Sequence, residues 1–274
     1  MDILGSQVEP RETKGIIRII QITDCHLGPQ IDYRLAGVRT LGSFEEVLAR
    51  LGRQPQAPDL VMVSGDIAAH GSRDAYRHFS QRMVAAKLNY SWLPGNHDDF
   101  ALMADIPAVP AYTPLLARGD WRIISLNTAV PHRVGGRLAD AELEFLALAL
   151  AEQANHPVVL FMHHPPMDVG CRWLDRQQVA NGEALAAILR SSTNVKAIFT
   201  GHVHQQASLE FAGIPLYCTP STCFQFAALQ EDFALADLPP GYRWINLYDN
   251  GTIETGVVFI EDTEEKVDAG VKGY

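Results

Sequence analysis

Apolar runs and segments of helical spacing alternate along the first two thirds of the chain. Short runs with no polar interruption are typical of strands buried on both faces. On this pattern we predict strands at Ile16–Ile22, Leu60–Ser64, Tyr90–Leu93, Trp121–Asn127, Pro157–Met162 and Val195–Thr200.

The segments between these strands predict helices. A capping box at Ser43–Glu46 would open a helix that continues to about Arg53. Apolar positions at helical spacing predict three more helices: one near Ser72–Lys87, one capped by Asp140 and including Leu150, and one at Asn181–Arg190. Residues Asp99–Asp120 contain three prolines and little periodicity, and we expect a loop there.

The last third of the chain has a different pattern. Ser208–Phe211 and Ile214–Cys218 flank an Ala-Gly turn, and Tyr242–Tyr248 and Thr252–Phe259 flank Asp-Asn-Gly, which favours a hairpin. The sequence therefore predicts an α/β fold in which β-α units lead into C-terminal β-hairpins. We expect one domain over residues 1–260 and a loose acidic tail over residues 261–274.

Composition and charge limit the partners and the cellular location that we expect for this protein. The chain has 274 residues, with 22 basic and 32 acidic side chains and a formal charge of −10. This charge disfavours nucleic acid and anionic membranes as partners. The first 15 residues lack the apolar segment of a signal peptide, and no stretch is long enough to span a membrane. The four cysteines form no CxxC pair, so we expect free thiols and a cytoplasmic protein.

Polar side chains follow five predicted strands directly. In open α/β sheets, ligands bind beyond the carboxyl ends of strands, so these segments should converge. Carboxylate, amide and imidazole groups suit Mn, Fe, Zn or Co. If Asp24–His26 is extended, residues two apart project to the same side and reach one ion. The five segments are Asp24–His26, Gly65–Asp66, Gly95–Asp98, His163–Pro166 and Gly201–His204.

This ordered set, D-x-H, G-D, G-N-H-D, H-H-P and G-H-x-H, resembles the calcineurin-like metallophosphoesterase family from about Ile16 to His204. The segments at residues 20–24, 92–96, 171–175, 219–223 and 241–244 are similar to the bacterial class III 3′,5′-cyclic AMP phosphodiesterases within it. The resemblance implies a four-layer αββα sandwich, in which two packed mixed β-sheets are flanked by helices.

The resemblance also implies a dinuclear metal site. One ion would be held by Asp24, His26, Asp66 and His204; Asp66 would bridge to a second ion held by Asn96, His163 and His202. His164 would then support the site without ligating. Cys25 stands where the family usually has another small residue, and we expect a packed thiol there.

The implied function is metal-dependent hydrolysis of cyclic AMP to 5′-AMP by activated water. His97 resembles the family histidine that contacts the phosphate and assists the leaving 3′-oxygen, and Asp98 would orient it. These two are the predicted catalytic residues. The substrate would contact His26, Asp66, Asn96, His97 and His204.

The sequence leaves several alternatives open. They are a broader phosphodiesterase that acts on glycerophosphodiesters or other cyclic nucleotides, and a non-catalytic scaffold that keeps the fold. The identity of the two divalent or mixed-valence ions and the oligomeric state also stay open. Candidate walls of the base pocket, each also typical of a core residue, are Trp173, Tyr217, Phe224 and Phe226.

Overall fold

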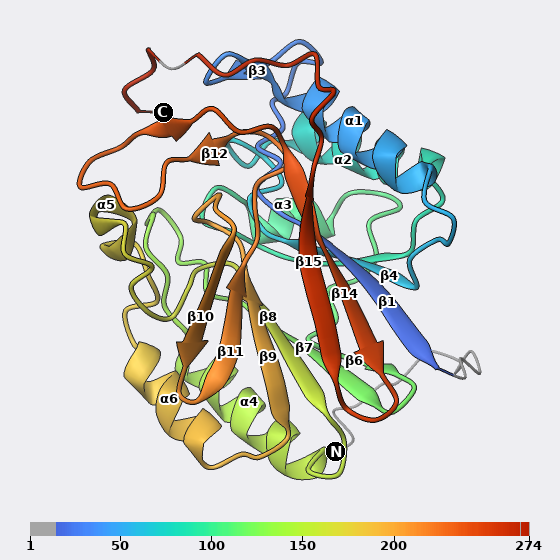
Figure 1. Cartoon of the computed structure of the whole chain (residues 1–274), viewed down its shortest axis with the longest axis vertical. Coiled ribbons are helices and arrows are strands. Elements are labelled where there is room, and N and C mark those ends of the chain that lie inside the picture. The colour runs from blue at the N-terminus through green and yellow to red at the C-terminus, as the bar shows by residue number, and fades with distance from the viewer. Residues whose placement is uncertain (1–14, 269, 274) are drawn as a thin grey trace.

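Two β-sheets stack face to face in the computed structural model, which describes residues 15–268 and 270–273 (Figure 1). The expectation for the first residues of the chain, that they form no signal peptide, concerns a segment outside this range apart from Gly15. In spatial order the first sheet contains β15 (Ile253–Phe259), β14 (Gly241–Tyr248), β1 (Ile16–Ile22), β4 (Leu60–Ser64) and β5 (Tyr90–Leu93). The second contains β10 (Ala207–Phe211), β11 (Ile214–Cys218), β9 (Val195–Thr200), β8 (Val158–Met162), β7 (Trp121–Leu126) and β6 (Leu115–Arg118).

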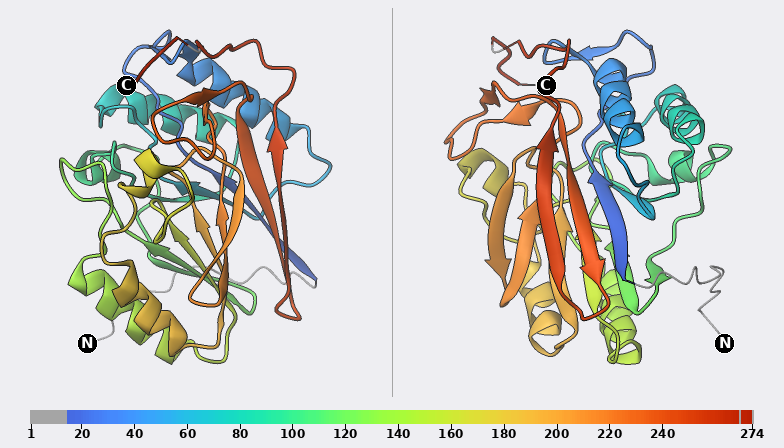
Figure 2. Two further views of the ribbon diagram at one scale, coloured as in Figure 1. Left: turned by 60° about the vertical axis from the view of Figure 1, so that its left-hand side comes forward. Right: turned by 45° about the vertical axis from the view of Figure 1, so that its right-hand side comes forward.

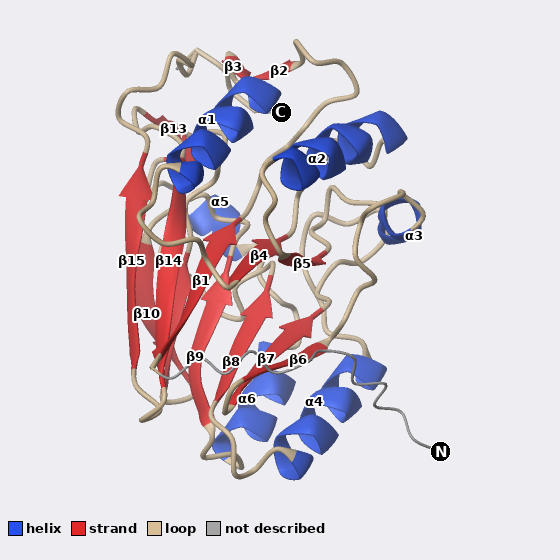
Figure 3. Cartoon of the chain, turned by 90° about the vertical axis from the view of Figure 1, so that its right-hand side faces the viewer, coloured by secondary structure: helices blue, strands red, loops and turns tan. Residues whose placement is uncertain are grey.

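Helices cover the outer face of each sheet (Figure 3). α1 (Thr40–Gly52) and α2 (Arg73–Ala85) pack on the first sheet, and α4 (Asp140–Glu152) and α6 (Gly182–Arg190) pack on the second. The short helices α3 (Phe100–Ala104) and α5 (Arg172–Asp175) lie in connections. This arrangement is the predicted four-layer sandwich.

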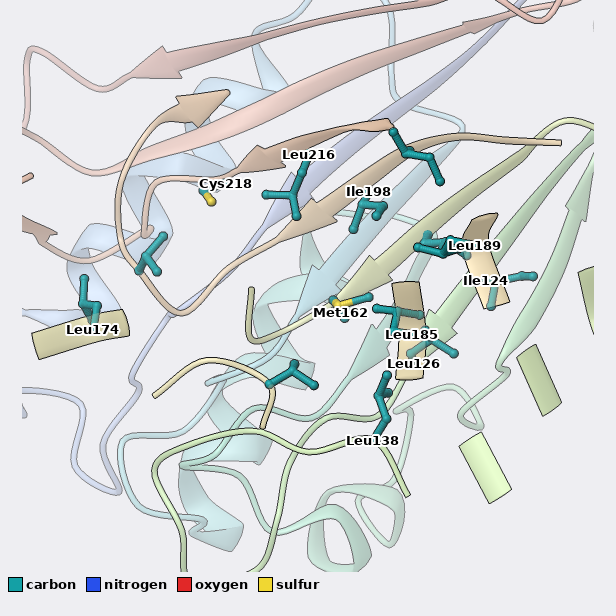
Figure 4. Close-up of a cluster of buried hydrophobic side chains, with 14 of the residues drawn as sticks. Ile124, Leu126, Leu138, Met162, Leu174, Leu185, Leu189, Ile198, Leu216 and Cys218 are labelled. Carbon is teal, nitrogen blue, oxygen red and sulfur yellow. The ribbon is translucent and has the colours of Figure 1, made fainter. Parts of the chain in front are cut away.

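Alternate residues of each central strand belong to different cores, which explains the uninterrupted apolar runs. In β1, Ile17 and Ile19 face the second sheet, whereas Ile20 and Ile22 face the helices. In β8, Phe161 faces the first sheet, and Leu160 and Met162 face α4 and α6. Figure 4 shows Met162 in this second core, near Leu126 and Leu185. Because both faces are buried, the runs have no polar alternation.

The strands that precede the polar segments run parallel within each sheet. β1 pairs with β4 and β4 with β5 in parallel, and β7, β8 and β9 are likewise parallel neighbours. Their carboxyl ends therefore share one edge of the sandwich. A backbone hydrogen bond from Asp24 N to Gly65 O (2.9 Å) continues the β1–β4 pairing past the strand ends.

Several local predictions need correction. α1 begins at Thr40, because Ser43 is buried inside the helix and its hydroxyl donates to Thr222 O (2.6 Å) instead of capping it. The predicted loop at 99–120 contains α3 and β6. Two short pairs were not predicted: β2 (Arg34–Leu35) with β3 (Val38–Arg39), and β12 (Gln225–Phe226) with β13 (Leu235–Ala236).

The segment after β15 lies against α1 and the β2–β3 pair (Figure 2). The hydroxyl of Thr263 bonds to Glu46, Glu265 pairs with Arg39 (3.0 Å), and Asp268 N donates to Ala36 O (2.8 Å). These contacts attach the described part of the acidic tail to the sandwich. No helix among the described residues combines the length and the apolar character needed to cross a membrane.

Candidate metal centre

The polar residues at the strand ends have an unusual backbone conformation. Positive φ angles occur at Asp24 (55°), His26 (47°), Asp66 (50°), His202 (66°) and His204 (45°). The expectation that Asp24 and His26 lie on an extended strand end is therefore wrong. A left-handed conformation costs a non-glycine residue roughly 1–2 kcal/mol, and such strain concentrates at functional sites. Tight left-handed turns aim these side chains back over the ends of the sheets.

Three glycines allow the strand ends to approach closely. A Cβ at Gly95 would lie 2.1 Å from Asp66 Oδ1, and one at Gly201 would lie 2.8 Å from Asp24 Oδ2. Gly65 has a φ of +96°, and a Cβ there would lie 2.5 Å from the His163 ring. The predicted need for glycine at these positions is confirmed by the contacts.

The two aspartates place one oxygen each at the centre of the imidazoles. Asp66 Oδ2 lies 3.2 Å from His163 Nε2 and 3.9 Å from His26 Nε2. Asp24 Oδ1 lies 3.3 Å from His204 Nε2 and 3.9 Å from His163 Nε2. The remaining oxygens accept backbone hydrogen bonds, Asp66 Oδ1 from His97 N and Asp24 Oδ2 from His202 N. The central oxygens are thus held in place for a cation.

Backbone carbonyls define the tautomer of two histidines. His163 Nδ1 lies 2.8 Å from Ser64 O, and His204 Nδ1 lies 2.8 Å from Phe224 O. A carbonyl only accepts, so each Nδ1 carries a proton, and each ring presents a lone pair at Nε2 once Nε2 has lost its proton to become a ligand. Both Nε2 atoms face the aspartate oxygens, which is the usual arrangement of metal-binding histidines.

Asn96 and His202 complete the cluster. Asn96 Oδ1 lies 3.2 Å from His163 Nε2 and 3.1 Å from His164 Nε2. His164 uses both nitrogens elsewhere, with Nδ1 at 2.8 Å from the Thr128 hydroxyl and Nε2 at 2.9 Å from Val134 O. This bonding fits the supporting role expected of His164. The structure brings all seven predicted ligands together, and all of them except Asn96 are buried.

Charge and burial give these groups shifted pKa values. Burial alone would lower the pKa of His163, but the Asp66 and Asp24 carboxylates raise it to about 9. Burial alone would raise the pKa of Asp66, but His163 and His97 hold it well below its usual range. Burial holds the pKa of His26 and that of His202 well below the usual range. Asp66 is therefore ionised, and His26 and His202 are neutral, as ligands must be.

The donor set fits bound metal. Asp24 Oδ1 and His202 Nε2 are buried and have no hydrogen-bond partner among the described residues. A buried unsatisfied polar atom costs about 1–3 kcal/mol, which a cation would offset. Overlapping groups of possible ligand atoms lie within 4.8 Å of one another among the described residues: Asp24–His26–His204, Asp24–Asp66–His163, His26–Asp66–His97 and His163–His164–His202. Shared membership of Asp24, His26 and Asp66 in more than one group suits two neighbouring ions.

The contacts of His97 differ from the sequence prediction. His97 Nδ1 lies 2.8 Å from Ala69 O, so that carbonyl orients the ring, and Nε2 lies 4.0 Å from Asp66 Oδ2. Asp98 instead accepts hydrogen bonds from the backbone N–H groups of Ile67, Ala68 and Gly95 and from the Tyr76 hydroxyl. The contact of His97 Nδ1 with Ala69 O therefore takes the place of the expected contact with Asp98. The sequence could not show this, because the orienting group is a backbone carbonyl.

The candidate base-pocket residues separate into two sets. Trp173 and Phe226 line a cavity of about 200 Å³ together with Asp66, Asn96, His97 and His202. Phe224 is fully buried beneath His26, and Tyr217 stacks on Phe199 near Arg243. Phe233 also lines the cavity and was missed, because nothing in its local sequence distinguishes it.

Cys25 is a packed thiol, as expected. It is fully buried in the core between the first sheet and helices α1 and α2. Burial raises the pKa of its thiol to about 12, so it stays protonated.

Fold and site together define a metal-dependent phosphoesterase, and comparison with known proteins agrees. The sequence profile of the calcineurin-like phosphoesterase family matches residues 17–206. The chain belongs to this family.

Curated relatives extend the similarity over nearly the whole chain. The 3′,5′-cyclic adenosine monophosphate phosphodiesterase CpdA of Escherichia coli (strain K12) is 35% identical over 97% of this chain and 98% of its own. The Pseudomonas aeruginosa CpdA is 32% identical over 96% and 97%. Among solved structures, a dimetal phosphatase from Danio rerio has a TM-score of 0.63 at 14% identity, covering 90% of this chain and 99% of its own. That likeness concerns the fold alone.

Proposed function

We propose that this protein is a dinuclear-metal phosphodiesterase that hydrolyses 3′,5′-cyclic AMP to 5′-AMP. The observation that carries the proposal is the meeting of seven oxygen and nitrogen donors at one edge of the sandwich, with Asp66 Oδ2 among the imidazoles. Relatives named as cyclic AMP phosphodiesterases align with 96–97% of the chain. A non-catalytic scaffold that only keeps the fold would be expected to lack some of the metal ligands. All seven predicted ligand residues are present in this chain.

The ligand roles in this proposal follow the donor positions. Asp24, His26, Asp66 and His204 would hold one ion, and Asp66, Asn96, His163 and His202 the other. Two such ions would offset the phosphodiester charge and acidify a water for in-line attack. We propose Fe or Mn as the native ions, with Zn and Co also suited to these donors. Asp24 and Asp66 keep their carboxylates aligned through the backbone N–H groups of His202 and His97.

His97 would assist the leaving group. In the reaction, a bond forms between the water oxygen and phosphorus, and the bond from phosphorus to the ribose 3′-oxygen breaks. His97 Nδ1 keeps its proton on Ala69 O, so Nε2 is the atom that would pass a proton to the 3′-oxygen. The ring is partly exposed on the cavity that Asn96 and His202 also line. Substrate contacts at His26, Asp66, Asn96 and His204 would surround the phosphate.

The proposal also includes the expected domain, the role of Asp98 and the cellular location. Residues 1–260 would act as one domain, since β14 and β15 complete the sheet that β1 begins. Asp98 would serve catalysis by holding the loop that carries Asn96 and His97. The enzyme would work in the cytoplasm on a small cyclic nucleotide, not on nucleic acid.

One assay series tests the function. Hydrolysis of cyclic AMP, cyclic GMP and glycerophosphocholine is measured on protein as purified, after chelation, and after addition of Mn, Fe or Zn. We expect chelation to abolish activity, metal to restore it, and kcat/KM to be highest for cyclic AMP. A preference for glycerophosphocholine would favour the broader phosphodiesterase. Inactivity with every ion would contradict the enzyme assignment.

A further inference from the structure

The cavity beside the metal centre is lined by two chemically distinct sets of residues. The polar set includes Asp66, Asn96, His97 and His202. The aromatic set consists of the rings of Trp173, Phe226 and Phe233. A ligand that enters this cavity meets the metal-binding groups and an aromatic wall at the same time.

The three rings form one packed cluster. The centroids of Trp173 and Phe226 lie 4.8 Å apart, those of Trp173 and Phe233 5.3 Å, and those of Phe226 and Phe233 5.7 Å. The rings come from α5, from β12 and from the connection between β12 and β13. Three separate segments thus build one aromatic wall, which consists of Trp173, Phe226 and Phe233.

The wall is anchored to the metal centre at one end. Phe226 is buried and stacks on His204 with a centroid distance of 4.3 Å and an interplanar angle of 23°. Trp173 and Phe233 pack against the core that contains Phe226 and are only partly buried. Phe226 is therefore the fixed member of the cluster, and the other two rings are the ones with exposed surface.

We infer that Trp173 and Phe233, supported by Phe226, form the subsite for the nucleobase of the substrate. This inference rests on the proposed function. Aromatic rings bind a planar base through its faces, and apart from Asp66 and histidines the described lining of this cavity has no ionisable side chain. The volume of about 200 Å³ is below the roughly 300–1,000 Å³ of drug-sized pockets, so the cavity suits a single base and not a polymer.

The test compares two substrates that share the cyclic phosphate. One is cyclic AMP, and the other is ribose 3′,5′-cyclic phosphate without a base. For Trp173→Ala and Phe233→Ala we expect kcat/KM on cyclic AMP to fall roughly 5- to 150-fold, mainly through KM, as for loss of a base–aromatic stack. The kcat/KM on the base-free substrate and the metal content should stay unchanged. Trp173→Phe, which keeps a stacking face, should retain most of the activity.

Tyr248→Ala is the matched control. Tyr248 is a partly exposed aromatic residue at the end of β14, paired with Ile16 at the start of β1 and so at the opposite end of the strand from Asp24. This variant should behave like the wild type on both substrates.

The outcomes separate the two proposals. If wild-type protein does not hydrolyse cyclic AMP with any ion, the proposed function fails. If wild-type protein hydrolyses it but does not prefer it to the base-free substrate, the base subsite is refuted. An equal loss on both substrates in the Trp173 and Phe233 variants would also overturn the inference.

Discussion

At the metal centre, the backbone at Gly95 packs so closely on Asp66 that no side chain fits there. The loop after β5 passes so close to Asp66 that a Cβ at Gly95 would also lie 2.5 Å from the Asp66 backbone nitrogen. Neither Asp66 nor its backbone can retreat, because Asp66 is held by His97 N and lies among the imidazoles.

Gly95→Ala should therefore damage stability and metal binding together. We expect the free energy of unfolding to fall by about 1–3 kcal/mol, as for overpacking of a rigid site. Denaturant unfolding and elemental analysis of the metals would measure both effects. Gly52→Ala is the control, because a Cβ there meets nothing within 4 Å and should be tolerated. Full metal content in Gly95→Ala would show that the loop can move away.

Substitution of His97 should separate the catalytic step from metal binding. Its Nε2 lies 4.0 Å from Asp66 Oδ2, but the ring is more exposed than the aspartates and histidines among the predicted ligands. His97→Ala should lower kcat about 10²–10⁴-fold, the usual value of general acid assistance. Metal content should change little. Steady-state kinetics with metal analysis would check this, and an unchanged kcat would remove His97 from the reaction.

At the scale of elements, the segment Thr219–Phe226 supports the metal centre from behind. The Ser221 hydroxyl donates to Asp24 O (2.8 Å) and accepts from Cys223 N (2.8 Å). Thr222 N donates to Thr23 O (3.1 Å), and Gln225 bonds to both backbone groups of Ser221. This segment joins the end of β11 to the left-handed turn that carries Asp24 and His26.

Ser221→Ala should weaken this support. The Asp24 carbonyl and the Cys223 N–H would each lose a buried partner, at a cost of about 1–3 kcal/mol in the free energy of unfolding. Metal content should fall as the Asp24 turn relaxes. Ser191→Ala is the control, since that hydroxyl is exposed and bonds only to Ile188 O among the described residues. Equal behaviour of the two variants in unfolding and metal analysis would count against a supporting role.

At the scale of the molecule, the metal centre joins the two sheets. Asp24, Asp66 and Asn96 follow strands of the first sheet, and His163, His202 and His204 follow strands of the second. Across this junction, Gln21 in β1 donates to Thr200 O in β9 (3.2 Å) and accepts from the hydroxyl of Thr219, which directly follows β11 (2.6 Å). Ions bound here would therefore link both halves of the sandwich.

Added metal should raise the melting temperature of chelated protein. An ion that binds only the folded state, at 100 times its Kd, stabilises by about 2.7 kcal/mol, or roughly 5–10 °C in a domain of this size. Calorimetry at increasing Mn²⁺ would show the shift, with Mg²⁺, which prefers oxygen ligands, as the comparison. A melting temperature that does not respond to Mn²⁺ would argue against the site.

The central strands and the chemistry of the site could be predicted from the sequence. β1, β4, β5 and β9 have the predicted bounds, because strands buried on both faces need uninterrupted apolar runs. The donor types and their places after strands pointed to one metal site, because parallel strands bring their carboxyl ends to a common edge. The order of the motifs along the chain indicated the calcineurin-like phosphoesterase family.

Other features depended on the tertiary structure. The start of α1 could not be predicted, because Ser43 bonds to Thr222, which is remote in sequence. The carbonyls that orient His97, His163 and His204 belong to Ala69, Ser64 and Phe224, and a carbonyl leaves no sequence signal because every residue has one. The chain by itself determined which atoms can bind metal; only folding decided their tautomers, their left-handed turns and the aromatic wall beside them, since these arise from contacts between distant segments.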